Sequence, residues 1–244
     1  MGRSPHPRPL SPEGRGRKNL NAVIWDVDGT LVDTAELHFY AWATLTRLLQ
    51  APFTRAYFNA TFGQRNADIV PGILGTAHPD GTPYTAEEIE AVGEAKEALY
   101  RGAARRQGVK LLPGAHALLG GLQSAGFKQA IGSSAPRENL ELILKLTETT
   151  HFFDAVVSME DTERGKPDPQ VFQVAAERLR MSPPRCVVME DAVAGVQAAK
   201  AAGMKCVAIR FAGHHDESAL TQAGANLVVR SLEEVSVERI RGLL

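Results

Sequence analysis

The chain has 244 residues, of which 44% are hydrophobic and 23% are charged, and its formal net charge at pH 7 is −1. These proportions are typical of globular proteins and exclude a fibrous or largely disordered chain. The balanced charge excludes a general attraction to polyanions, so we expect neither nucleic acid nor a membrane as a partner.

The first nineteen residues differ in composition from the rest of the chain. Residues 1–19 contain four prolines and three glycines but almost no apolar side chains, so we expect a disordered tail. The tail lacks the apolar segment of a secretory signal, and no stretch of the chain approaches the roughly 18 apolar residues of a membrane span. Cys186 and Cys206 lie in apolar runs, which favours buried thiols and a reducing, cytoplasmic setting.

From residue 20 onward, short apolar runs alternate with helical patterns. The apolar runs predict buried strands at residues 21–27, 128–133, 155–158, 185–190, 205–210 and 226–229. Helical patterns occupy residues 114–125, 136–147, 169–180 and 192–202. This alternation predicts a doubly wound, Rossmann-like α/β core, in which helices cover both faces of a parallel sheet.

The segment between the first and second strands interrupts this alternation. It has helical patterns at residues 35–50, 55–60, 66–73 and 86–106, and it contains no convincing strand. The turn signal Leu112-Pro113-Gly114 then returns the chain to the α/β pattern. We therefore expect three parts: the tail at 1–19, an α/β core at 20–33 and 110–244, and an inserted helical module at 34–109.

Polar residues follow four of the predicted strands, at the sheet edge where doubly wound domains bind ligands. They are Asp26 and Asp28, Ser133 and Ser134, Lys166, and Glu190 with Asp191. Crowded carboxylates repel by roughly 4 kcal/mol for unit charges 4 Å apart at an effective dielectric of 20, so this cluster needs a cation. Carboxylate oxygens suit Mg²⁺, and a lysine with serine hydroxyls can orient phosphate. The set predicts phosphoryl transfer.

Each fragment alone also has an ordinary structural explanation. A DG pair can form a hairpin turn, and acidic residues at a helix start can match the helix dipole. Because all four fragments occur in order, each beyond a strand of the same predicted sheet, the functional interpretation is favoured.

The fragments DVDGTLVDT, GSSAPREN, GKPDP and MEDAVAGVQAAKAAGM resemble, in this order, the four motifs of the haloacid dehalogenase (HAD) superfamily. The resemblance is to its phosphatase branch with a helical cap, and it covers roughly residues 20–230. It implies that Asp26 is the nucleophile and Asp28 the general acid and base. It further implies that phosphate is bound by Ser133, Ser134 and Lys166. Mg²⁺ would be coordinated by Asp26, the main-chain carbonyl of Asp28, and Asp191. Glu190 would act on the metal through water or as an orienting group.

Within the cap, DTAELHFYAW, FGQRN and AEEIEAVGEAKEALY resemble stretches of beta-phosphoglucomutase. This resemblance implies that Thr34, His38, Arg65 and Lys96 lie at the substrate. His38 could instead be a packed or solvent-facing histidine, and Lys96 a solvated helix lysine. Departures from the mutase pattern occur at Pro136, Arg137 and Ala192. The other histidines, expected to be structural or on the surface, are His78, His116, His151, His214 and His215.

The combined expectation is a magnesium-dependent, monomeric phosphatase that forms a phospho-aspartyl intermediate and acts on a small phosphorylated metabolite, with sugar phosphates as the expected class. The alternative is an isomerase of the beta-phosphoglucomutase type, in which a sugar hydroxyl replaces water as the acceptor. A non-catalytic phosphate-binding protein on the same fold is a third possibility. The intact set of Asp26, Asp28, Lys166 and Asp191 argues against it.

Overall fold

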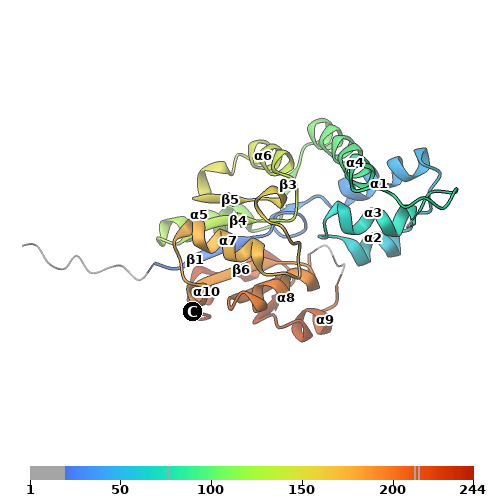
Figure 1. Cartoon of the computed structure of the whole chain (residues 1–244). Coiled ribbons are helices and arrows are strands. Elements are labelled where there is room, and N and C mark those ends of the chain that lie inside the picture. The colour runs from blue at the N-terminus through green and yellow to red at the C-terminus, as the bar shows by residue number, and fades with distance from the viewer. Residues whose placement is uncertain (1–19, 76, 212, 214) are drawn as a thin grey trace, which may run out of the picture.

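The computed structural model describes residues 20–75, 77–211, 213 and 215–244, and it shows an α/β core beside a helical cap (Figure 1). The expected disordered tail at 1–19 and His214 lie outside the described residues. None of the helices described is long and apolar enough to cross a membrane.

A parallel six-stranded sheet, with strand order β5-β4-β1-β6-β7-β8, forms the centre of the core. Its strands are β1 (Ala22–Trp25), β4 (Lys128–Gly132), β5 (Ala155–Val157), β6 (Cys186–Glu190), β7 (Lys205–Ile209) and β8 (Leu227–Val229). All six match predicted apolar runs, and the predicted fold class is confirmed. β1 is fully buried because β4 and β6 flank it, with Ala22 opposite both Lys128 and Cys186.

Helices cover both faces of the sheet, as the alternation of strands and helices predicts. They are α5 (Ala115–Ser124), α6 (Arg137–Leu146), α7 (Gln170–Leu179), α8 (Val193–Ala201), α9 (Glu217–Gln222) and α10 (Val237–Arg241). Successive side chains of β1 point to opposite faces. Val23 and Trp25 therefore pack in the cluster that includes α5, α6 and α10, whereas Ala22 and Ile24 pack with α7, α8 and α9.

In the described part of the chain the cap consists of four helices, and Figure 1 shows them to one side of the core. They are α1 (Ala35–Leu48), α2 (Arg55–Thr61), α3 (Asn66–Leu74) and α4 (Ala86–Gln107), and all four were predicted. Aromatic and aliphatic side chains from the first three helices, among them Trp42, Phe58 and Ile69, form a separate hydrophobic cluster. α4 begins at a capping box in which Thr85 and Glu88 exchange hydrogen bonds.

A two-stranded antiparallel ribbon joins core and cap. β2 (Val32–Asp33) carries the chain toward the cap and β3 (Lys110–Leu111) carries it back, with Asp33 opposite Lys110. The residue pattern shows no convincing strand in the insert and does not predict this ribbon, because two residues are too few to show a period. The two crossings of the chain are therefore adjacent.

Candidate active site

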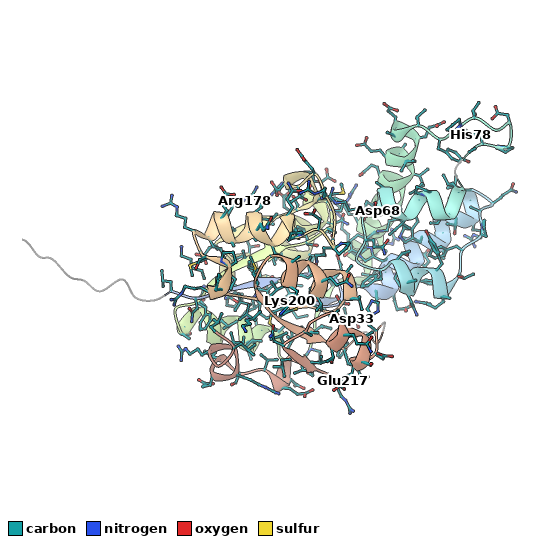
Figure 2. The ribbon with its side chains drawn as sticks, turned by 60° about the horizontal axis from the view of Figure 1, so that its bottom comes forward. Asp33, Asp68, His78, Arg178, Lys200 and Glu217 are labelled. Carbon is teal, nitrogen blue, oxygen red and sulfur yellow. The ribbon has the colours of Figure 1, made fainter. Side chains whose placement is uncertain are left out.

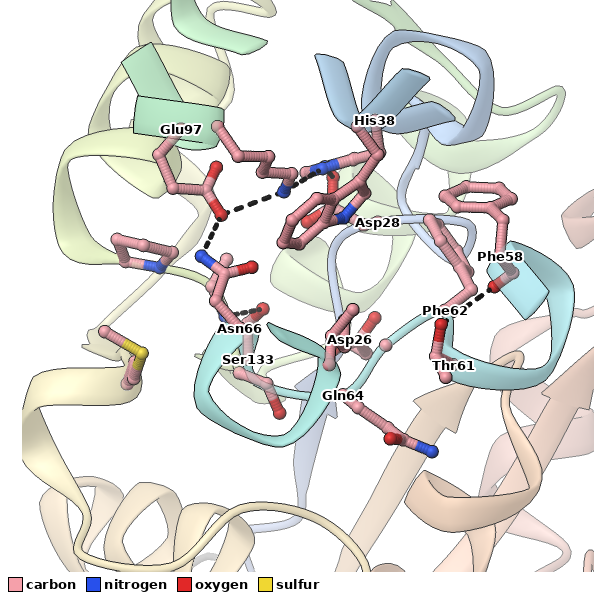
Figure 3. A pocket seen from close by; sticks show the side chains of 18 residues that line it. Asp26, Asp28, His38, Phe58, Thr61, Phe62, Gln64, Asn66, Glu97 and Ser133 are labelled. Atoms are coloured by element: carbon pink, nitrogen blue, oxygen red, sulfur yellow. Dashed lines mark hydrogen bonds and ion pairs between the residues drawn. The ribbon is translucent and has the colours of Figure 1, made fainter. Parts of the chain in front are cut away.

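A pocket lies between the carboxyl edge of the sheet and the cap (Figure 3). The core contributes Asp26, Asp28, Ser133, Ser134, Pro136 and Met159 to its lining. Rings from the cap and a few polar cap side chains, including His38, Lys96 and Glu97, line the opposite side. Residues that are far apart in the sequence thus converge where three strands end.

Asp26 and Lys166 form a buried ion pair at the floor of the site. The Lys166 Nζ lies 2.6 Å from Asp26 Oδ1 and also donates to Glu190. Burial raises the pKa of Asp26 to about 7, although the Lys166 ammonium opposes the rise. Burial also disfavours the charged lysine, but Asp26 and Glu190 together raise the pKa of Lys166 above its usual value. Lys166 is therefore a fixed cation beside the Asp26 carboxyl group.

Glu190 is held in place by the backbone that follows it. Its Oε2 accepts hydrogen bonds of 2.7 Å from the amides of Asp191 and Ala192. The other oxygen, Oε1, accepts from Lys166, and the side chain is 1% exposed. Glu190 therefore orients Lys166 and adds a second negative charge next to Asp26.

Asp26, Glu190 and Asp191 offer carboxylate oxygens that lie within 4.8 Å of one another. The Thr30 hydroxyl donates to Asp191 Oδ1 at 3.2 Å. Burial, followed by the charges of Glu190 and Asp26, raises the pKa of Asp191 well above its usual value. Three buried carboxylates near a single lysine lack positive charge, and oxygen donors of this kind fit Mg²⁺. The donor set is thus compatible with the expected metal.

Gly29 lets the backbone pass directly beneath Asp191. Its φ is +83°, a region that other residues avoid, and an added Cβ would lie 2.2 Å from Asp191 Oδ2. The shape of the turn after β1 therefore depends on the absence of a side chain at Gly29, because any Cβ would displace a carboxylate of the acidic cluster.

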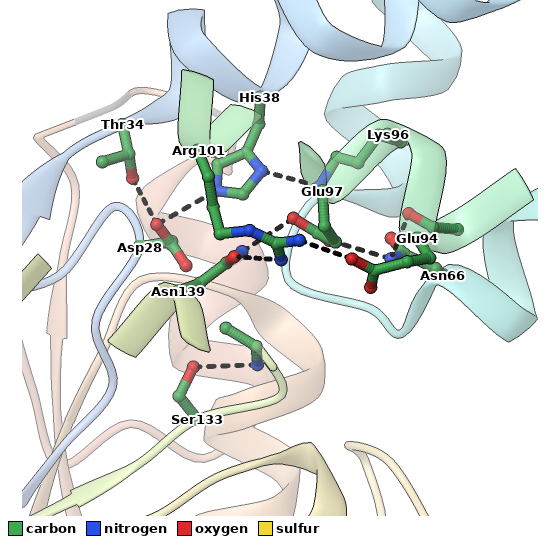
Figure 4. Close-up of polar contacts among 12 residues, drawn as sticks. Asp28, Thr34, His38, Asn66, Glu94, Lys96, Glu97, Arg101, Ser133 and Asn139 are labelled. Carbon is green, nitrogen blue, oxygen red and sulfur yellow. Dashed lines mark hydrogen bonds and ion pairs between the residues drawn. The ribbon is translucent and has the colours of Figure 1, made fainter. Parts of the chain in front are cut away.

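The Asp28 carboxylate faces the cap and lies outside this acidic cluster (Figure 4). Its Oδ1 accepts from the Thr34 hydroxyl and lies 3.1 Å from His38 Nε2. Burial favours the neutral acid, but His38 and Thr34 outweigh it and lower the pKa of Asp28. Asp28 is thus an ionised carboxylate that can accept a proton.

His38 connects Asp28 to Lys96. The Lys96 Nζ lies 2.8 Å from His38 Nδ1, and the ring stacks on Tyr100 with a centroid distance of 3.9 Å. Because an ammonium can only donate, Nδ1 must accept and Nε2 must carry the proton that points to Asp28. His38 is buried, as a packed histidine would be, and it also lines the pocket.

The two serines after β4 both line the pocket. Ser133 is 3% exposed, and its Oγ accepts from the amide of Ala135. That hydroxyl keeps its proton available for donation to a phosphate oxygen, since the Ala135 contact uses only an acceptor position.

Arg65 was expected at the substrate, but the structure directs its side chain elsewhere. Its guanidinium donates to the carbonyls of Thr162, Glu163 and Arg164 at 3.0 to 3.1 Å, and to the Thr162 hydroxyl. Arg65 does not line the pocket described above. It belongs to the cap and contacts a core loop, so its visible role is to join the two parts.

Glu97 is a buried pocket residue that the sequence analysis missed. It lies on α4 next to Lys96 and is 3% exposed. α4 carries several other glutamates, and nothing in the residue pattern separates the buried one from the solvated ones. In the sequence, only its position directly after Lys96 points to it.

Pro136 lines the pocket, whereas Arg137 pairs with Asp161. Of the expected structural or surface histidines, His78, His116, His151 and His215 lie outside the lining of the pocket.

Comparisons with known proteins find relatives of two activities. The family model described as haloacid dehalogenase-like hydrolase matches residues 20–203. The chain is 33% identical to a beta-phosphoglucomutase of Bacillus subtilis (strain 168), over 90% of this chain and 93% of that protein. It is 31% identical to a phosphorylated carbohydrates phosphatase of Thermotoga maritima, over 89% of this chain and 98% of that protein. The crystal structure of beta-phosphoglucomutase from Clostridium difficile superposes with a TM-score of 0.80 at 25% identity, covering 92% of this chain and 96% of that one.

Proposed function

The chain belongs to the haloacid dehalogenase-like hydrolase family, and from this premise we propose that it hydrolyses phosphate monoesters of small metabolites, with sugar phosphates as the substrate class. The observation that carries the proposal is the buried ion pair of Asp26 and Lys166 beneath a pocket open to the cap. The relatives that act on phosphorylated carbohydrates support the choice of substrate class.

In the proposed reaction Asp26 attacks phosphorus, and the bond between phosphorus and the leaving oxygen breaks. Asp28 is ionised in the free protein, so it first takes up a proton when the substrate phosphate binds. It gives this proton to the leaving oxygen and later takes one from the attacking water, so the carboxylic acid is restored for the next cycle. Lys166, Ser133 and Ser134 hold the phosphate oxygens. Bound by Asp26, Asp191, Glu190 and the Asp28 carbonyl, Mg²⁺ would neutralise charge on the transferring phosphate.

An isomerase of the beta-phosphoglucomutase type is the second candidate. Sequence and structural similarity to beta-phosphoglucomutases and the placement of His38 and Lys96 in the pocket favour it. A sugar hydroxyl, instead of water, would then accept the phosphoryl group from Asp26. A non-catalytic binder is disfavoured because it would not need the carefully held Asp28 carboxylate.

The cellular setting is also a proposal. Both cysteines, Cys186 and Cys206, are buried and free, which supports a reducing, cytoplasmic environment. We also propose that the protein is a monomer.

Two assays run in parallel test the reaction. One measures phosphate released from a panel of sugar monophosphates with Mg²⁺, and the other measures glucose 6-phosphate formed from beta-glucose 1-phosphate with a trace of glucose 1,6-bisphosphate. We expect phosphate release to be the faster reaction and to fall by about a thousandfold or more in Asp26→Asn, which keeps the shape of the side chain but removes the nucleophile. Isomerisation that outruns phosphate release would favour the second candidate. Turnover of Asp26→Asn within about tenfold of wild type would exclude the covalent mechanism.

A further inference from the structure

We infer that the cap selects substrates with a single phosphate, because Glu97 cancels the charge of Lys96, the cation that the cap presents to the pocket. The inference rests on the proposed function and narrows its substrate class to monophosphate esters of uncharged, hydroxyl-bearing alcohols. Glu97 is accordingly a specificity residue, acting through Lys96.

The pairing of Lys96 with Glu97 is close and buried. The Lys96 Nζ lies 2.9 Å from Glu97 Oε1, and each residue is 3% exposed. The Lys96 ammonium also donates a hydrogen bond to His38 Nδ1. Burial favours the neutral acid, but the charge of Lys96 and the hydrogen bonds from Lys96 and Asn139 outweigh it and lower the pKa of Glu97 to about 2. The Glu97 carboxylate therefore balances the positive charge of the Lys96 side chain that it contacts.

Glu97 is also prevented from turning away from Lys96. Its Oε1 accepts from Asn66 Nδ2 at 2.8 Å, and its Oε2 accepts from Asn139 Nδ2 at 2.7 Å (Figure 4). Asn139 lies on α6 of the core, whereas Asn66 begins α3 of the cap. Because amides from both parts hold the carboxylate, a ligand phosphate would have to break several buried hydrogen bonds to displace it.

The other cations near the pocket are also engaged. Lys96 is the one lysine or arginine among the described residues that line it. Arg65 binds the carbonyls of the loop at 162–164, and Arg137 pairs with Asp161. Lys166 serves the transferring phosphate through its contact with Asp26. A second phosphate would therefore meet no unpaired cation in this part of the structure.

The rest of the cap lining suits a neutral group. Rings and aliphatic side chains of Trp42, Phe58, Phe62 and Ile69 lie beside the uncharged polar side chains of Thr61, Gln64 and Asn66. Such a surface can bind the apolar face and the hydroxyls of a sugar or polyol. A second phosphate buried there would lose its hydration without gaining a matching charge. A mutase that passes through a bisphosphate faces the same cost, so the inference also favours hydrolysis.

The test measures binding, separately from turnover. In an Asp26→Asn background with Mg²⁺, calorimetry compares glucose 6-phosphate with glucose 1,6-bisphosphate, and fructose 6-phosphate with fructose 1,6-bisphosphate. We expect the monophosphate to bind more tightly in at least one pair. Adding Glu97→Gln should shift the ratio of the two dissociation constants toward the bisphosphate by about tenfold, because it frees the charge of Lys96. The matched control is Glu90→Gln, which removes one charge from an exposed position on the same helix and should leave the ratio unchanged.

A double variant keeps the test decisive if Glu97→Gln does not fold. Lys96→Gln with Glu97→Gln removes a pair of zero net charge, so monophosphate affinity should stay within about threefold of the background. A loss of more than about tenfold would overturn the inference, since Lys96 would then contribute its charge to binding. Three further results would overturn the inference. They are tighter binding of the bisphosphate than of the monophosphate in both pairs, no binding of any of the four sugars, and an unchanged ratio of dissociation constants in Glu97→Gln.

The proposed function has its own readout. Phosphate release by the wild-type enzyme together with an unchanged binding ratio would overturn the inference alone. The expected binding ratios without phosphate release from any monoester would support the inference and overturn the proposed hydrolysis.

Discussion

Gly195, near the start of α8, occupies a position where any side chain would strike the active site. A Cβ there would lie 1.8 Å from Glu190 Oε1 and 2.0 Å from Glu190 Cδ. Glu190 in turn orients Lys166. Gly195 is therefore needed to leave room for the Glu190 carboxylate, which lies outside the helix, and it does not stabilise the helix itself.

Replacing Gly195 by alanine should invert the usual effect of such a change. Alanine normally favours a helix over glycine by about 1 kcal/mol. Here the clash must move Glu190, so we expect a lower melting temperature and a fall in kcat of about a hundredfold or more. The control is Gly102→Ala in α4, where the nearest atom is the flexible Arg106 Nη1 at 3.4 Å. Wild-type activity in Gly195→Ala would show that Glu190 does not position Lys166.

The acidic cluster should couple Mg²⁺ to stability. Binding to the folded state alone raises the melting temperature. We expect Mg²⁺ to raise that of the wild-type protein by several degrees relative to chelator, because it relieves repulsion among Asp26, Glu190 and Asp191. Asp191→Asn should melt higher than wild type in chelator and respond weakly to Mg²⁺. Thermal melts of both proteins with and without Mg²⁺ measure this, and an equal response of the two would remove Asp191 from the metal site.

Residues at the ends of strands were predictable, and residues whose role depends on the docking of the cap were not. Asp26, Lys166 and Asp191 follow strands or strand loops of one sheet, so the topology alone brings them together. Glu97 meets Asn139 only because α4 lies against α6, and local sequence carries no trace of that contact. The position of Arg65 in a loop was visible, but the direction of its side chain depends on a core loop about a hundred residues away.

At the scale of elements, the start of α3 in the cap contacts a core loop that begins at η2 (Met159–Asp161). Figure 2 shows the cap against the core. Arg65, the residue before α3, donates to several carbonyls that follow η2. A planar guanidinium can reach these acceptors together, and an ammonium cannot. The contact therefore depends on arginine as well as on positive charge.

We expect Arg65→Ala to lower the free energy of unfolding by about 1–3 kcal/mol, because several carbonyls of the core loop lose hydrogen bonds from a charged donor. Arg65→Lys should restore little of it. Inhibition by inorganic phosphate should be unchanged in both variants, since Arg65 lies outside the pocket lining. Urea unfolding and phosphate inhibition measure the two effects. Weaker inhibition with unchanged stability would show that Arg65 binds the ligand.

The elements themselves differed in how well the sequence predicts them. Long helices and buried strands repeat their pattern over enough residues to be recognised. β2 and β3 have two residues each, and they pair because the two ends of the insert meet. A ribbon of this kind is a product of tertiary structure and has no local signature.

At the scale of the whole molecule, Glu97 links stability to pH because it joins the cap to α6 of the core. Its pKa lies at about 2 in the folded protein, below the ordinary value of 4.5. A carboxyl group whose pKa is lower in the folded state stabilises fully above its unfolded value, and the contribution is lost as the pH falls toward the folded value.

The stability difference between wild type and Glu97→Gln should therefore be largest at neutral pH and shrink as the pH falls from about 4.5 to about 2. Urea unfolding at a series of pH values measures the difference, with Glu90→Gln as the control at an exposed position of the same helix. A difference that stays constant over this range would mean that Glu97 is not ionised in the folded protein.

β1, the strand that Asp26 directly follows, precedes the other strands of its sheet in the described chain and pairs only with strands that come much later. β1 lies at residues 22–25, yet its neighbours are residues 128–131 of β4 and 186–189 of β6. On the ribosome, the cap emerges before either neighbour does, and its helices make mostly local contacts, which form quickly. The nucleophile and its ligand-binding partners can assemble only after most of the chain has been translated, so an apolar strand must wait unpaired beside a cap that is already folding.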